Sequence, residues 1–207
     1  MSELQLHGRT RSNYFNAVKA VLREKAIPFN EVIEPVPPRA EYMQLSPMAK
    51  IPCLNTSAGP ITETLVILDY LETRYPEPAL QPKDVYQQAK QRELCKFLEL
   101  YVEWVGRRGY GALRGEAVAE HTRTSIADDL NKALPALQQL VTFSPWIAGD
   151  EFTYADIFGY FMLVYARLSA QANADIDLFA ALPGSREWFD RVAQRDSVQS
   201  VLADASG

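Results

Sequence analysis

The hydrophobic pattern of this chain changes at a proline-rich stretch that runs from Pro76 to Pro82. Before this stretch, short extended segments and helical periodicities follow one another in the order β-α-β-α-β-β-α. After it, apolar residues recur only at helical spacing. We therefore expect an α/β plus all-α architecture, with an α/β domain over residues 1–77, a linker over 78–85 and an all-helical domain over 86–207.

The strongest local signals of the first domain lie in its opening segment and around a proline. Leu4 and Leu6 alternate with polar residues and predict a short strand, and a helix is expected from Asn13 to Lys25. A second strand is expected from Asn30 to Ile33. Pro52 lies in a short apolar segment, and because proline cannot donate a ladder hydrogen bond, it belongs at a strand entrance or edge. A cis peptide bond there would be a deliberate turn feature.

In the second half of the chain, the sequence predicts where one helix begins and where another breaks. Thr153 and Asp156 have the spacing of a capping box, in which each side chain accepts from the other residue's amide. The helix that follows is apolar nearly all round, so it should run through the middle of the helical domain. Pro135 lies within an earlier helical pattern, which should kink or break near it.

Charge and cysteine content argue against several classes of function. The formal net charge is −5 over 207 residues, and the basic residues are scattered, so no nucleic-acid partner is expected. The stretch from Met1 to Arg11 lacks the apolar run of a signal peptide or membrane span, which favours a cytoplasmic protein without a membrane partner. Two cysteines and two histidines in no ligand pattern predict no metal site. We expect the reactive group to come from a bound molecule.

Four segments of the chain resemble the cytosolic glutathione transferases, of a bacterial, serine-dependent type. Each segment is weak evidence alone, but their order and separation argue against a chance match. They are Leu6-His7-Gly8 through Ser12-Asn13-Tyr14 to Lys25-Ala26-Ile27-Pro28; Ser46-Pro47-Met48-Ala49-Lys50-Ile51-Pro52; Thr62-Glu63-Thr64 with Ile67, Tyr70 and Leu71; and Ala148-Gly149-Asp150 with Phe152-Thr153-Tyr154-Ala155-Asp156.

The resemblance implies a thioredoxin-like N-terminal domain followed by a C-terminal helical bundle. It also implies glutathione as co-substrate, conjugation of its thiolate to a small hydrophobic or anionic electrophile, and a homodimer. The interface of that dimer would lie on the helices near Glu63 to Arg74 and Tyr86 to Tyr101.

The resemblance also assigns glutathione-binding residues. Pro52 matches the cis-proline of the family, and Ile51 would pair its backbone with the cysteinyl part of glutathione. Glu63 and Thr64 match the pair that holds the γ-glutamyl end. Helix N-terminal amides attract a carboxylate and Glu63 offers a charge to an ammonium, although the same residues could merely cap a helix.

Two further assignments each leave alternatives open. The glycyl carboxylate needs a cation, and Arg39 and Lys50 are the candidates in the matching loop. Ser12 matches the position that contacts the sulfur of glutathione, yet it is equally well placed to be the N-cap of the helix that follows. Thr10 and Tyr14 are the alternatives for the sulfur contact.

The electrophile pocket is the least specified part of the site. The expected pocket residues come from two places: Tyr101, Trp104, Arg108 and Tyr110 from the helix after the linker, and Arg9 and Arg11 from either side of the active loop, with Tyr14. An aromatic pocket with a cationic rim is therefore expected. Some of these aromatic residues could instead make dimer or core contacts.

Competing functions follow from the same resemblance. A glutathione-binding carrier or regulatory protein with little turnover is the alternative to the enzyme. A thiol-disulfide oxidoreductase is disfavoured because Ser12 stands where a reactive cysteine is needed, and Cys53 is expected to be buried and inert. The isomerase pattern of the zeta-type enzymes is absent from residues 10–22.

Overall fold

The computed structural model describes residues 4–206, which divide into two compact units. The first unit contains the chain up to Leu80 and also the C-terminal segment from Gln194. The second unit is Gln81–Ala193. The last helix of the chain therefore belongs to the α/β unit, although it follows the helical unit in sequence.

The α/β unit is built on a four-stranded sheet of order β2-β1-β3-β4. The first strand pairs parallel with β2 and antiparallel with β3, and β3 pairs antiparallel with β4. The bounds are β1 (Leu4–Gly8), β2 (Phe29–Ile33), β3 (Cys53–Thr56) and β4 (Gly59–Thr62). This β-α-β first half and β-β-α second half form the thioredoxin-like arrangement predicted from the sequence.

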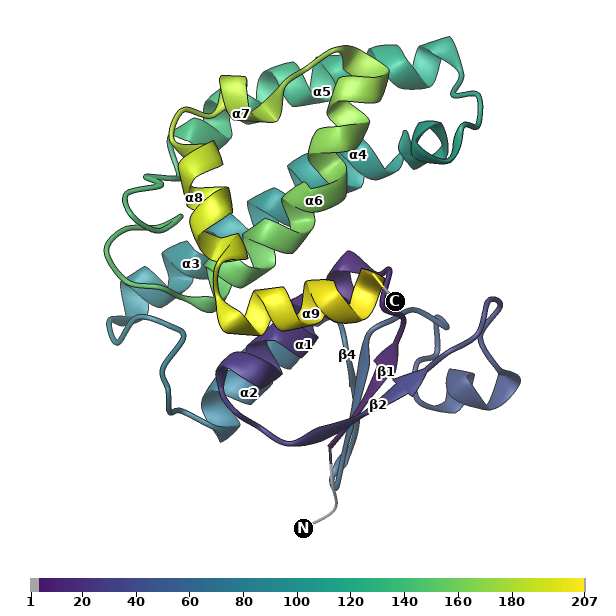
Figure 1. Ribbon diagram of the computed structural model, residues 1–207, viewed down its shortest axis with the longest axis vertical. Coiled ribbons are helices and arrows are strands. Elements are labelled where there is room, and N and C mark those ends of the chain that lie inside the picture. The colour runs from purple at the N-terminus through teal and green to yellow at the C-terminus, as the bar shows by residue number, and fades with distance from the viewer. Residues whose placement is uncertain (1–3, 207) are drawn as a thin grey trace. The chain divides into compact units, whose positions relative to one another are not determined.

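Three α-helices accompany this sheet. They are α1 (Asn13–Glu24), α2 (Thr64–Arg74) and α9 (Asp196–Ser206), and a 3-10 helix, η1 (Ala40–Gln44), precedes β3. Helix α1 contacts both α2 and α9, and Figure 1 shows α1 and α2 beside the sheet. The apolar faces of these elements form the core, in which Leu6, Phe15, Leu22, Leu54 and Ile67 are fully buried.

Charged side chains fix α9 to α1. The ammonium group of Lys19 is buried and lies 2.7 Å from carboxylate oxygens of both Glu31 and Asp204. The carboxylate of Glu24 accepts a hydrogen bond from the Ser197 hydroxyl at 2.6 Å. Since a buried ammonium group is stable only when it is paired, Lys19 ties the end of the chain to the first unit.

The second unit is helical throughout its described residues, apart from turns and an isolated bridge between Trp146 and Gly149. Helix α5 continues through Pro135 and ends three residues later, close to the predicted break. The elements are α3 (Val85–Phe97), a π-helical segment η2 (Leu98–Glu103), α4 (Trp104–Arg107), a 3-10 helix η3 (Tyr110–Arg114), α5 (Glu120–Gln138), α6 (Tyr154–Ala174), α7 (Leu178–Ala181) and α8 (Ser185–Ala193).

Helix α6 is the central helix of this unit, as predicted, and contacts α3, η2, α4, α5 and α8. The predicted capping box of Thr153 and Asp156 is present at its N-terminus. The Asp156 carboxylate also accepts from the Ile147 amide at 2.7 Å and from the Trp188 indole at 2.8 Å. One buried carboxylate therefore joins α6, α8 and the loop that precedes α6.

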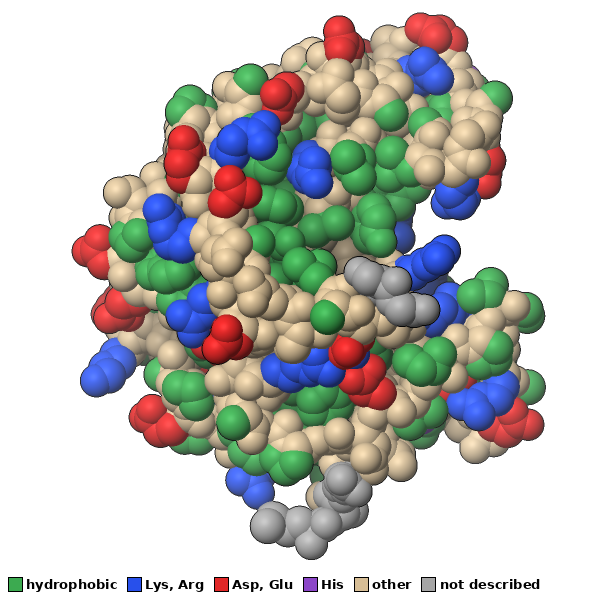
Figure 2. All heavy atoms as spheres, in the orientation of Figure 1, with side chains coloured by type: hydrophobic (Ala, Val, Ile, Leu, Met, Phe, Trp, Pro, Cys, Tyr) green, Lys and Arg blue, Asp and Glu red, His purple; other side chains and the backbone are tan. Residues whose placement is uncertain are grey.

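Figure 2 shows one face of the surface, on which Lys and Arg side chains are interspersed with Asp and Glu. Among the residues that the structure describes, no helix is long and apolar enough to cross a membrane. The same residues contain no group of three or more His, Cys, Asp or Glu that could hold a metal ion.

Candidate functional site

The turn after β1 places Ser12 at the N-terminus of α1. Gly8 is required at the end of the strand because a Cβ atom there would lie 2.0 Å from a ring carbon of the buried Phe15. The Ser12 amide donates to the Arg9 carbonyl at 2.9 Å, and the Asn16 side chain donates to another carbonyl of the turn at 2.8 Å. The half-buried Ser12 is therefore held in a defined position.

The hydroxyl of Ser12 caps α1. Its Oγ accepts a hydrogen bond from the Phe15 amide at 3.3 Å, which confirms the interpretation of Ser12 as the N-cap residue. A serine hydroxyl has one proton in addition to its lone pairs, and none of the described residues accepts that proton. The hydroxyl can therefore cap the helix and still donate to an anion at the same helix end.

The loop before β3 presents the backbone of Ile51. The carbonyl of the preceding Lys50 accepts from the Tyr42 hydroxyl at 2.7 Å and from the Ser46 hydroxyl at 2.8 Å. The Lys50 amide donates to the same Ser46 oxygen at 3.1 Å. The peptide bond between Ile51 and Pro52 is cis, as the sequence predicted.

This anchoring leaves the backbone of Ile51 available. Among the described residues, none hydrogen-bonds the Ile51 amide or carbonyl, and the ladder with β1 begins only at Cys53. An unpaired backbone amide and carbonyl before the start of a strand can pair with the backbone of a bound peptide.

The N-terminus of α2 has an unusual backbone conformation. Glu63 is the N-cap residue, with φ 67° and ψ 117°, and its exposed side chain makes no capping hydrogen bond. Thr64 follows in the first helical turn and is 3% exposed. Positive φ at a residue other than glycine costs of order 1 to 3 kcal/mol and concentrates at functional sites. The side chain of Glu63 therefore does not cap α2.

The two candidate cations differ in their partners. The guanidinium of Arg39 forms hydrogen bonds of 2.8 and 3.2 Å with the carboxylate of Glu34, which also bonds His7 Nδ1 at 2.9 Å. Burial acts to raise the pKa of Glu34, but Arg39 and His7 outweigh it and hold that pKa below its ordinary value. The side chain of Lys50 is exposed, and no carboxylate of the described residues is paired with it.

The side chain of Arg9 is bound to backbone carbonyls. Its guanidinium donates to the carbonyl of Glu34 at 2.9 Å and to that of Pro35 at 2.6 Å. Arg9 therefore connects the turn after β1 to the end of β2.

Cys53 is fully buried, and its sulfur lies 3.7 Å from the carbonyl of Leu45. Burial raises the pKa of its thiol to about 11. The expectation that Cys53 is buried is confirmed, and the raised pKa favours the protonated thiol at neutral pH, so its inertness stays a prediction.

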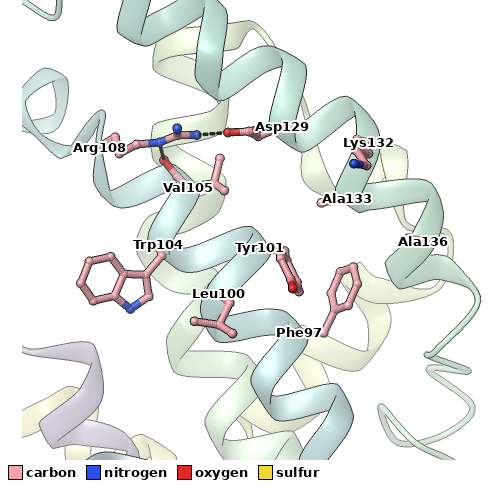
Figure 3. A pocket seen from close by; sticks show the side chains of 10 residues that line it. All are labelled: Phe97, Leu100, Tyr101, Trp104, Val105, Arg108, Asp129, Lys132, Ala133 and Ala136. Carbon is pink, nitrogen blue, oxygen red and sulfur yellow. Dashed lines mark hydrogen bonds and ion pairs between the residues drawn. The ribbon is translucent and has the colours of Figure 1, made fainter.

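The helical unit contains a cavity of about 690 Å³ between the long helix of α3, η2 and α4 and helix α5. Tyr101, Trp104 and Arg108, three of the predicted pocket residues, line it together. Figure 3 shows their side chains, with those of Asp129 and Lys132 on α5. The volume lies within the usual range for small-molecule sites. Tyr110 does not line it, and its hydroxyl donates to Glu103 at 3.1 Å.

Sequence reasoning did not identify the α5 side of this cavity. Asp129, Lys132, Ala133 and Ala136 line it at helical spacings of three and four residues. That spacing marks one face of α5, but it does not tell which helix the face meets.

Comparisons with known proteins match both halves of the chain to the same family. A family profile described as the glutathione S-transferase N-terminal domain matches residues 6–79, and one described as the C-terminal domain matches residues 89–191. A glutathione S-transferase from Pseudomonas putida is 34% identical over 202 residues, covering 97% of this chain and 92% of the relative.

Solved structures share the whole fold. Poplar glutathione transferase F1 has a TM-score of 0.82 at 20% identity, covering 100% of this chain and 99% of that chain. A glutathione transferase homologue from Sulfitobacter, solved with bound glutathione, has a TM-score of 0.80 at 19% identity and covers 99% of both chains.

Proposed function

This chain belongs to the glutathione S-transferase family and uses glutathione as its co-substrate, and we propose that its α/β unit binds and activates glutathione while its helical unit binds a small hydrophobic or anionic electrophile. The carrier alternative is not favoured, because a relative named glutathione S-transferase is 34% identical over nearly the whole chain. The chain is accordingly an enzyme that conjugates glutathione.

The observation that carries the proposal is the anchored but unpaired backbone of Ile51. Two hydroxyl groups fix the carbonyl of Lys50, so the Ile51 amide and carbonyl need no reordering to receive a ligand. We assign them to the cysteinyl backbone of glutathione, which they would bind as an added strand. Pro52 shapes the same segment.

The γ-glutamyl end is assigned to the N-terminus of α2. Thr64 offers a hydroxyl and a first-turn amide to the carboxylate, and the helix dipole favours negative charge there. The exposed Glu63 carboxylate offers a partner to the ammonium group. The positive φ of Glu63 supports this assignment because strained backbone conformations concentrate at functional sites.

For the glycyl carboxylate we favour Lys50 over Arg39. The guanidinium of Arg39 already neutralises the buried Glu34, whose side chain is 1% exposed. Moving Arg39 to a ligand would leave the buried carboxylate of Glu34 with His7 as its one side-chain partner among the described residues. Lys50 is next to Ile51 and has no such commitment among the described residues.

Ser12 is proposed to donate a hydrogen bond to the thiolate. A free thiol of pKa about 8.5 is roughly 3% ionised at pH 7, and lowering the pKa by about two pH units takes about 2.7 kcal/mol. A hydroxyl bond to an anion, at roughly 1.5 to 3 kcal/mol, and a helix N-terminus, at roughly 0.3 to 1 kcal/mol, suffice.

Acidifying the thiol gives only part of the rate. The thiolate population rises about 25-fold, but nucleophilicity falls about eightfold at a Brønsted slope near 0.45, which leaves a net gain of about threefold. Most of the acceleration must come from holding the electrophile at the sulfur. We assign the electrophile to the cavity that Tyr101, Trp104 and Arg108 line. That Arg9 and Tyr14 contact the electrophile stays a prediction; in the structure Arg9 donates to two backbone carbonyls.

The assembly and location are part of the same proposal. We propose a homodimer through the helices near Glu63 to Arg74 and Tyr86 to Tyr101, where Val66 and Tyr86 are exposed. Because Tyr101 also lines the electrophile cavity, it serves either the interface or the electrophile. A cytoplasmic location is also proposed. Light scattering that gives the mass of one chain over a wide concentration range would refute the dimer.

Calorimetry on the whole chain tests the glutathione site. We expect Lys50→Gln to raise the Kd for glutathione about fivefold, the equivalent of one exposed ion pair, and Arg39→Gln to raise it less. The matched ligand is the glycyl ethyl ester of glutathione, which lacks the carboxylate, so its Kd should not respond to Lys50→Gln. A carboxylate-dependent loss in Arg39→Gln alone would reverse the assignment. Absence of glutathione binding to the wild type would refute the site altogether.

A further inference from the structure

Asn16 bonds to the backbone on both sides of Ser12. Its side-chain amide donates to the Thr10 carbonyl at 2.8 Å, and its main-chain amide donates to the Ser12 carbonyl at 2.9 Å. The residue itself lies in the second half of the first turns of α1, four positions after the N-cap. Asn16 therefore ties the turn that joins β1 to α1 onto the helix (Figure 1).

Helix formation does not explain an asparagine at this position. Asparagine stabilises a helix less than alanine does, because its side chain competes for backbone hydrogen bonds. Asn16 is also 7% exposed, and a buried amide group costs stability unless it is hydrogen-bonded. The bond to the Thr10 carbonyl uses this amide as a donor, so the side chain serves the turn and not the helix.

The other end of the turn has an anchor of its own. The guanidinium of Arg9 donates to the carbonyls of Glu34 and Pro35, which fixes residue 9 to the end of β2. With both ends held, the place of Ser12 at the helix N-terminus is set before a ligand binds. Preorganised donors need no reorganisation when charge develops, whereas a displacement of about 1 Å can cost about 100-fold in rate.

From these contacts we infer that Asn16 is a positioning residue for the activation of glutathione, which aims the Ser12 hydroxyl at the thiolate without touching the sulfur itself. The inference rests on the proposed role of Ser12 as the hydrogen-bond donor to the thiolate. Without the Asn16 amide, the Thr10 carbonyl loses its donor and the turn can shift. The Ser12 hydroxyl then stabilises the thiolate less, and the pKa of the bound thiol rises.

A double-mutant cycle on the whole chain tests the inference. Thiolate absorbance of the glutathione complex is titrated against pH in wild type, Asn16→Ala, Ser12→Ala and the double variant. Alanine favours the helix, so Asn16→Ala should fold. It should raise the pKa of the bound thiol by about half to one pH unit, part of the rise of about one to two units expected in Ser12→Ala. In the Ser12→Ala background it should add nothing, because no hydroxyl remains to be aimed.

Asn173→Ala is the matched control. Asn173 is likewise 7% exposed, and its side chain donates to the Gly109 carbonyl at 3.1 Å in the helical unit. Both variants should lose stability in urea unfolding, because each removes a buried hydrogen bond. The pKa of the bound thiol should rise in Asn16→Ala and stay at the wild-type value in Asn173→Ala.

The cycle separates failure of the inference from failure of the proposed role of Ser12. If Ser12→Ala raises the thiol pKa and Asn16→Ala does not, Asn16 only stabilises the fold, and the role of Ser12 stands. If Asn16→Ala raises the pKa equally in the wild-type and Ser12→Ala backgrounds, Asn16 acts without Ser12 and the inference is wrong. An equal rise in Asn173→Ala would show that the pKa follows stability. An unchanged pKa in Ser12→Ala would refute the role of Ser12 and the inference with it.

Discussion

Ser46 provides the sharpest test of how the glutathione loop is held. Ser46 is 1% exposed. Its hydroxyl donates to the Lys50 carbonyl at 2.8 Å and accepts from the Lys50 amide at 3.1 Å. Ser46→Ala removes both bonds, and at about 1 kcal/mol each the loss is about 2 kcal/mol. Tyr42→Phe removes a single bond to the same carbonyl, and we expect a loss of about 1 kcal/mol.

These losses should appear in ligand binding because the two bonds orient the backbone of Ile51. If glutathione binding must first restore the native orientation of the Ile51 backbone, the Kd for glutathione rises by up to about 30-fold in Ser46→Ala and by up to about fivefold in Tyr42→Phe. Calorimetry gives the Kd, and urea unfolding gives the stability. Ser57→Ala, in the exposed turn between β3 and β4, is the control and should change neither.

One pattern of results would refute this reasoning. If Ser46→Ala lowers the free energy of unfolding by about 2 kcal/mol but leaves the Kd for glutathione at the wild-type value, the Ser46 bonds stabilise the fold without orienting the ligand-binding backbone.

Three further predictions concern buried groups. Asp156→Ala leaves the Ile147, Thr153 and Trp188 donors without their acceptor, so it should cost about 3 to 5 kcal/mol of stability in urea unfolding, and a loss below about 1 kcal/mol would contradict the network. Because Arg39 and His7 lower the pKa of Glu34, the ionised Glu34 should stabilise the folded protein at neutral pH. This stabilisation should be lost as the pH falls from about 4.5 through the lowered pKa. Unfolding curves of wild type and Glu34→Gln that keep a constant separation down to about pH 3 would refute this. Cys53, with a thiol pKa of about 11, should resist a thiol reagent at pH 8 until the protein is unfolded, and rapid labelling of the native protein at this residue would show that it is not buried.

Local signals in the sequence were sufficient for the layout of the α/β unit. The alternation at Leu4 and Leu6 and the helical spacing after Asn13 predicted β1 and α1, because period and burial agree there. The backbone bend before α2, which begins at Thr64, was not predicted. Glu63 takes a positive φ there, which no propensity favours for a glutamate.

Contacts between segments distant in sequence were not predictable in the same way. The pairing of Lys19 with Asp204 brings the last helix into the first unit, and periodicity contains no information about such a pair. The commitment of Arg39 to Glu34 likewise became visible only when β2 and the following loop were placed. The residue types of the candidate site were therefore predicted from the sequence, while our proposal of Lys50 over Arg39 rests on the contact between Arg39 and Glu34.

Thiolate absorbance of the glutathione complex, titrated against pH in wild type and Ser12→Ala, tests the central claim most directly. If the Ser12 hydroxyl donates to the thiolate while its oxygen caps α1, the pKa of bound glutathione rises by about one to two pH units in Ser12→Ala. The loss of the cap also lowers stability by about 1 kcal/mol, which urea unfolding measures separately. Superimposable titration curves with that loss of stability would contradict the account: Ser12 would then be only a helix cap, and Thr10 and Tyr14 would become the candidates for the sulfur contact.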